Sequence, residues 1–147
     1  MRTSLRHVGI VVDNLGIWLE FLQEILNYQI MVDQVETGDF ISKLIGIPDV
    51  SVRTIKLKDE KNGVIELLKF NNPDLRTITN TKMSPNSRGI THIAITVESI
   101  EDVMNGTKKM GFEPIYNPQI SSDGKVLVCY LRGPESILFE FVEVLPL

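Results

Sequence analysis

The hydrophobic and polar positions of the chain follow a pattern that occurs twice. HVGIVV, which begins at His7, matches HIAITV, which begins at His92, and each is an apolar run of strand length. After each run come an acidic residue, a helix N-cap candidate, apolar residues at helical spacing, and an aromatic residue that opens another strand. The pattern predicts a strand, a helix and a second strand in each half.

The predicted helices have recognisable ends. Asn14 and Ser99 stand where an N-cap side chain belongs, and Asn27 and Gly111 stand where a left-handed residue ends a helix. The apolar helix positions are Trp18, Phe21, Leu22, Ile25 and Leu26 in the first copy, and Ile100, Val103, Met104 and Thr107 in the second. We therefore expect one amphipathic helix per half.

The later strands also repeat, at a constant offset of 74 residues without a gap. Residues 51–68 lie over residues 125–142, and both segments read as strand, turn and strand. The turns contain KNG in the first half and GPE in the second. Each half is therefore a predicted βαβββ module.

These modules predict an α+β fold for residues 1–147, taken as a single domain. Module one spans 5–70 and module two spans 89–145, and the polar, proline-containing segment 71–88 links them. Such a module does not easily bury both faces of its sheet alone. Two modules side by side would complete one curved, mixed sheet with the helices on its outer face.

Composition and charge exclude several kinds of partner and of covalent cross-link. The chain has 147 residues and a net charge of −4, which disfavours nucleic acid as a partner. No apolar run approaches the roughly 20 residues that cross a bilayer, and no signal-peptide core follows the N-terminus, so we expect a cytoplasmic protein without a membrane partner. The single cysteine, Cys129, excludes a disulfide within the chain and is expected to be a small buried residue.

Four polar residues occupy matching positions in the two modules. His7 corresponds to His92, the only other histidine, and Glu66 corresponds to Glu140, each carboxylate lying within an apolar strand. Taken singly, such residues are often surface groups. Their paired recurrence instead predicts a nitrogen and oxygen ligand set for one divalent ion, Zn, Ni, Co, Mn or Fe, with positions left for water or substrate.

The doubled module with HVGIVV, VIELL, HIAITV and LFEFVE resembles the vicinal oxygen chelate superfamily, which includes glyoxalase I, methylmalonyl-CoA epimerase, extradiol dioxygenases and bleomycin-resistance proteins. The resemblance extends from His7 to Val144. It implies a cup-shaped mixed sheet whose floor carries His7, Glu66, His92 and Glu140 around one metal ion.

The resemblance also implies a reaction. A metal-dependent lyase, isomerase or epimerase of the glyoxalase I type would chelate vicinal oxygens of a small carbonyl or thioester substrate while a glutamate moves a proton. Glu140 matches that base, with Glu66 as the symmetric alternative. The other interpretations are a metal-independent binding protein of the bleomycin-resistance type and a ring-cleaving dioxygenase. The family also implies a homodimer, with modules pairing within one chain or between two.

Two further features bear on the substrate. Residues 36–48 have no counterpart in the second half, and predict a short helix, capped by Asp39, that is either a lid or a cover for its own module. Four basic residues are candidates to meet an acidic substrate or to be solvated strand-edge charges. They are Arg53, Lys69, Arg88 and Arg132.

Overall fold

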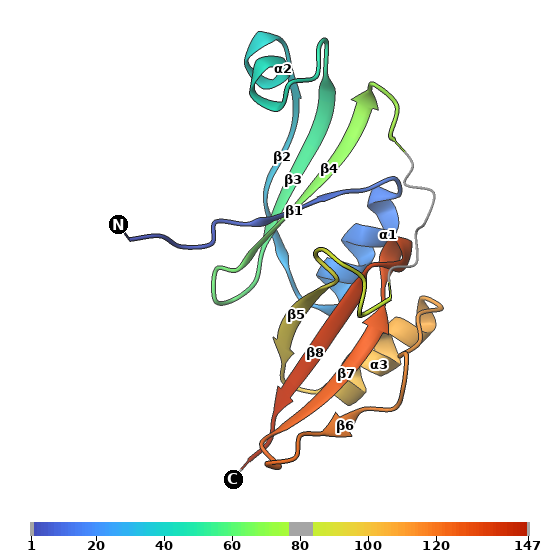
Figure 1. Ribbon diagram of the computed structural model, residues 1–147. Coiled ribbons are helices and arrows are strands. Elements are labelled where there is room, and N and C mark those ends of the chain that lie inside the picture. The colour runs from blue at the N-terminus through green and yellow to red at the C-terminus, as the bar shows by residue number, and fades with distance from the viewer. Residues whose placement is uncertain (1, 77–83, 147) are drawn as a thin grey trace. The chain divides into compact units, whose positions relative to one another are not determined.

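The computed structural model describes residues 2–76 and 84–146. The chain divides into two compact units, residues 1–77 and residues 78–147, and each is described by itself (Figure 1). Strand residues continue to Asn72, so the first two positions of the expected linker belong to the last strand of the first unit. Positions 77–83 of that linker lie outside the described residues.

The first unit is a four-stranded mixed sheet with two helical segments. Its strand order is β1-β4-β3-β2, in which β1 runs parallel to β4 and the other neighbours are antiparallel. The elements are β1 (Val8–Val11), α1 (Leu15–Glu20), the π-helical turn η1 (Phe21–Ile25), β2 (Gln29–Thr37), α2 (Asp39–Ile45), β3 (Ser51–Lys58) and β4 (Val64–Asn72).

The second unit repeats this topology. Its strand order is β5-β8-β7-β6, again with one parallel pair, β5 with β8. The elements are β5 (His92–Val97), α3 (Ile100–Lys109), β6 (Gln119–Ile120), β7 (Val126–Arg132), the 3-10 turn η2 (Pro134–Ser136) and β8 (Leu138–Val144). The predicted α+β fold of two tandem βαβββ modules is confirmed, and α2 is the addition that distinguishes the first.

The helix ends follow the predicted capping chemistry. The Asn14 side chain accepts a hydrogen bond from Ile17 N at 3.2 Å, and Ser99 Oγ accepts one from Asp102 N at 3.1 Å. Asn27 and Gly111 adopt left-handed φ values of 56° and 81°. The first helix differs from prediction in its second half, where Leu26 N bonds to Phe21 O and winds a π-helical turn.

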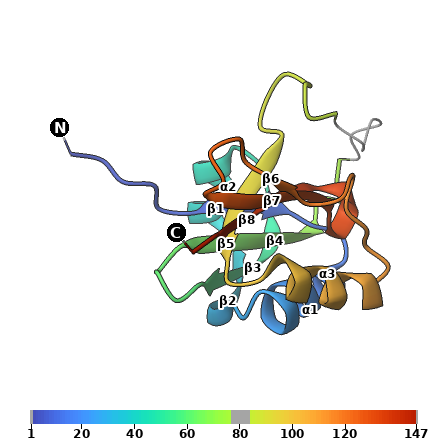
Figure 2. The same ribbon diagram turned by 90° about the horizontal axis from the view of Figure 1, so that it is seen from below.

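Strand alternation separates a buried sheet face from the face that carries Glu66. In β4, Ile65 and Leu67 are 4% and 0% exposed and pair across the sheet with the fully buried Leu57 and Ile55. Successive side chains point to opposite faces, so Glu66, between these two residues, lies on the other face. In the second unit α3 packs against β7 and β8 on one side of the sheet (Figure 2). Cys129 is buried there, as predicted, and burial raises the pKa of its thiol.

No helix of the described residues is long and apolar enough to span a membrane.

A substitution at Leu67 tests which face of the first sheet is buried. Leu67→Ala should lower the free energy of unfolding by about 3 kcal/mol, because truncation removes apolar contacts and leaves a cavity in a close-packed strand. Urea denaturation followed by circular dichroism measures this change. The control, Val35→Ala on the edge strand β2, removes a side chain that is 58% exposed and should change the value by less than about 0.5 kcal/mol. Equal effects of the two variants would contradict the assignment of faces.

Candidate metal centre: two equivalent histidine–glutamate pairs

The strand register places residues from equivalent positions of the two units on either side of each glutamate. Glu66 on β4 is flanked by Gly9 on β1 and Lys56 on β3. Glu140 on β8 is flanked by Ala94 on β5 and Tyr130 on β7. Registered neighbours share a sheet face, so each carboxylate shares its face with the residue from the strand on either side.

In the first unit the carboxylate of Glu66 contacts two nitrogen groups. His7 Nε2 lies 3.2 Å from Glu66 Oε2, and Lys56 Nζ lies 3.3 Å from Oε1. The Glu66 side chain is only 14% exposed, whereas those of His7 and Lys56 are about a third exposed, at 30% and 31%. A largely buried carboxylate therefore has a different partner on each oxygen.

In the second unit the equivalent carboxylate has a different set of contacts. His92 Nε2 lies 3.0 Å from Glu140 Oε2, and Tyr130 Oη donates a hydrogen bond of 3.0 Å to that same oxygen. The Tyr130 ring packs edge-on against His92 with 5.2 Å between centroids, and Thr91 Oγ1 lies 2.9 Å from His92 Nδ1. Burial and the Glu140 carboxylate together raise the pKa of Tyr130.

The structure thus brings together His7 with Glu66 and His92 with Glu140. Within the described residues, His, Cys, Asp and Glu side chains form no group of three or more that could hold a metal ion. The four-ligand set stays a prediction, while each half of it is a direct contact within one unit.

The two pairs have the chemistry and spacing that a divalent ion requires. Imidazole nitrogen and carboxylate oxygen ligands lie about 2.0–2.2 Å from such an ion, which puts adjacent ligand atoms roughly 3 Å apart. The His-to-Glu separations of 3.2 Å and 3.0 Å match that spacing. Lys56 contacts Oε1 of Glu66 and leaves Oε2 on the histidine side. Each pair, taken by itself, therefore offers two donors at a spacing that suits a divalent ion.

Sequence analysis missed Lys56 and Tyr130. The offset of 74 residues that aligns Glu66 with Glu140 also aligns these two, so a signal was present in the sequence. Their proximity to the carboxylates becomes visible only when the pairing of β3 with β4 and of β7 with β8 is known.

The four basic residues that could either meet an acidic substrate or be solvated charges at strand edges have the following surroundings. Arg53 donates two hydrogen bonds, of 2.8 Å and 2.7 Å, to Asp33 and thereby lowers the pKa of that carboxyl. Lys69 pairs with Asp13, Arg132 Nη1 donates to Ser136 O at 3.2 Å, and Arg88 is exposed. The cation next to a predicted ligand is Lys56 instead.

Helix α2 covers part of the face on which Glu66 lies. Positions 66, 68 and 70 of β4 share that face, and Ile41 of α2 packs in a cluster with Val52, Leu68 and Phe70. Gly38, not Asp39, is the N-cap residue of this helix. Phe40 and Leu44 remain 76% and 66% exposed. The helix therefore covers its own module through Ile41, and whether it also acts as a lid stays a prediction.

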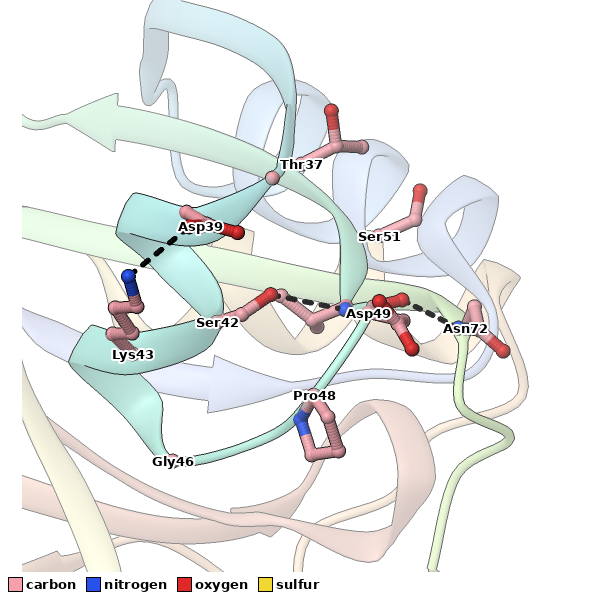
Figure 3. A pocket seen from close by; sticks show the side chains of 11 residues that line it. Thr37, Asp39, Ser42, Lys43, Gly46, Pro48, Asp49, Ser51 and Asn72 are labelled. Carbon is pink, nitrogen blue, oxygen red and sulfur yellow. Dashed lines mark hydrogen bonds and ion pairs between the residues drawn. The ribbon is translucent and has the colours of Figure 1, made fainter.

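A hollow of about 700 Å³ lies on the other flank of α2 (Figure 3). Ser42 Oγ accepts a hydrogen bond from Val50 N at 3.3 Å, Lys43 pairs with Asp39 at 3.0 Å, and Asn72 Nδ2 donates to Asp49 O. The Ser42 contact ties the loop after α2 back to that helix, and the Asn72 contact ties the loop to the end of β4. None of the predicted ligands lines this hollow.

Comparison with known proteins identifies relatives of this fold. A family model described as the Glyoxalase/Bleomycin resistance protein/Dioxygenase superfamily matches residues 6–130. A glyoxalase family protein from Bacillus cereus aligns with a TM-score of 0.87 and 24% identity, over 99% of this chain and 97% of that chain. No curated protein sequence gives a match.

A second solved structure is similar to this chain and contains a metal. It is a mutant of the fosfomycin resistance protein FosX from Listeria monocytogenes, complexed with Mn(II) and 1S,2S-dihydroxypropylphosphonic acid. It aligns with a TM-score of 0.61 and 18% identity, over 96% of this chain and 90% of that chain. Identities at this level show the shared fold.

The contact between Tyr130 and Glu140 can be tested by titration. Glu140→Gln should move the pKa of Tyr130 down toward its ordinary value, because the variant removes the negative charge that opposes formation of tyrosinate. Ultraviolet absorbance of the metal-free protein at increasing pH measures tyrosinate, and Tyr130→Phe identifies its signal. An unchanged pKa in Glu140→Gln would show that burial alone causes the shift.

Proposed function

Because the chain belongs to the glyoxalase, bleomycin resistance protein and dioxygenase superfamily, we propose that it is a divalent-metal-dependent lyase, isomerase or epimerase of the glyoxalase type. Its substrate is a small carbonyl or thioester compound with two neighbouring oxygens. The observation that carries the proposal is the recurrence of one histidine–glutamate contact at register-equivalent positions of both units.

In this proposal His7, Glu66, His92 and Glu140 bind one ion among Zn, Ni, Co, Mn and Fe. The fit of each pair to ligand spacing supports it, as does the Mn(II) bound by the similar FosX protein. Such an ion, when bound, polarises two adjacent substrate oxygens and so acidifies a neighbouring C–H bond. The remaining coordination positions are left for those oxygens.

Glu66 and Glu140 have different roles in this proposal. Lys56 contacts one oxygen of Glu66, which suits Glu66 to a fixed ligand role. Tyr130 donates to Glu140 and orients it without adding a charge, so we assign proton transfer to Glu140, with Glu66 as the symmetric alternative. A Glu140 oxygen would take the proton from the carbon beside the carbonyl. In isomerisation that proton returns to the former carbonyl carbon, while the hydroxyl proton passes to the former carbonyl oxygen. In epimerisation a proton returns to the opposite face of the same carbon.

The active assembly in this proposal is a homodimer, in which modules pair within a chain or between chains. Elution at monomer size across working concentrations would contradict it. Cytoplasmic location stays a prediction from the sequence.

Metal analysis and turnover test the site and the reaction together. We expect wild-type protein, loaded with a divalent ion, to catalyse hemithioacetal isomerisation or thioester epimerisation. Glu140→Gln should lower kcat by about 10² to 10⁴, because positioned proton transfer contributes that factor. Metal content by mass spectrometry and product formation by chromatography are the measurements.

The control for this experiment is Glu101→Gln, which changes an exposed carboxylate of α3 and should leave turnover within about twofold. Retained metal-dependent turnover in Glu140→Gln would remove Glu140 as the base. Failure of wild type to bind any divalent ion would contradict the metal assignment. In that case, small-molecule stabilisation that persists after chelation would favour a binding protein.

A further inference from the structure

Lys56 is the residue that breaks the equivalence of the two units. Lys56 lies on the strand next to Glu66 and in register with it, as Tyr130 does with Glu140 in the second unit. The two units therefore share a histidine–glutamate pair and differ in the third side chain, an ammonium in one and a phenol in the other.

The Lys56 ammonium has more hydrogen-bond donors than its contact with Glu66 uses. A lysine ammonium has three N–H donors, and this one forms an ion pair with Glu66 Oε1, 3.3 Å away. The Lys56 side chain is 31% exposed on the same face as Glu66 and His7. It can therefore donate to a ligand that approaches the pair from that face.

The net charge of the proposed metal site indicates how Lys56 would affect the choice of substrate. With two neutral imidazoles, the charges of Glu66 and Glu140 cancel those of a divalent ion, so the proposed ligand set is neutral when loaded. Lys56 adds one positive charge beside it. A positive charge at this range favours an anion over a neutral molecule of the same shape.

We propose that Lys56 is a specificity-determining residue that makes the site select substrates with a negatively charged oxygen next to the second chelating oxygen. The chemical class is a small carbonyl compound that carries a carboxylate beside the carbonyl group, such as a 2-oxo acid. This inference rests on the proposed function and names its substrate class. If Lys56 only neutralised Glu66, replacing it would change the affinities for a charged and a neutral ligand to the same extent.

Glycolate and glycolamide form a matched pair of probes, since both offer two neighbouring oxygens and only glycolate is charged. Their affinities for the Mn(II)-loaded protein are measured by titration calorimetry. Lys56→Met should weaken glycolate binding about tenfold and change glycolamide binding less than twofold. Lys56→Arg, which keeps the charge, should restore most of the preference.

Lys69→Met is the matched control, because it removes the same charge from β4 on the opposite face, where Lys69 pairs with Asp13. It should leave both affinities within about twofold. Equal weakening of glycolate and glycolamide in Lys56→Met, or an unchanged preference, would overturn this inference while leaving the metal assignment intact. If wild type binds neither probe in a metal-dependent way, the proposed function and this inference both fail.

The affinity for Mn(II) alone gives a readout that does not depend on substrate. Lys56→Met should bind Mn(II) several-fold more tightly, because it removes a cation that competes for the Glu66 carboxylate. Weaker binding in this variant would show that Lys56 holds Glu66 in place as a structural group. Circular dichroism of each variant establishes that the fold is retained.

Discussion

The structure depends on placing a carboxylate in the middle of an apolar strand. Glu66 and Glu140 are largely buried side chains, and an isolated charge in such a position is costly. Strand alternation reduces the cost, because Ile65 and Leu67 turn toward the core while Glu66 turns toward the other face. The parallel strand beside each glutamate then places a histidine next to it. The same sheet therefore buries apolar side chains on one face and positions the histidine–glutamate pairs on the other.

The duplication repeats the sheet that holds each histidine–glutamate pair, while the residues around the two pairs differ. Both units have the same strand order and the same pairing of the glutamate with its two neighbouring strands. The departures are local: helix α2 follows β2 only in the first unit, and Lys56 replaces Tyr130. Residues at such places change the chemistry without a change of fold, because they lie on the face opposite the core.

Much of the fold could be predicted because its signals are local and occur twice. The caps at Asn14 and Ser99 depend on residues a few positions apart, and the strand pairs follow one fixed offset. The π-helical turn at Phe21 could not be predicted, since a single i→i+5 bond leaves the apolar spacing unchanged. Likewise the pairing of Arg53 with Asp33 joins residues 20 positions apart and requires the register of β2 with β3.

The same distinction applies to the candidate site and explains why its proposed ligands could be singled out in the sequence and their neighbours could not. A histidine or glutamate in an apolar strand departs from its surroundings, so its type and position alone indicate chemistry. Lys56 and Tyr130 do not, because a lysine or tyrosine in a half-exposed strand is ordinary on its own. They gain meaning only through contact with a carboxylate, 3.3 Å and 3.0 Å away. In our proposal the two histidine–glutamate pairs bind the metal, and their different neighbours on the same sheet face determine which substrates bind.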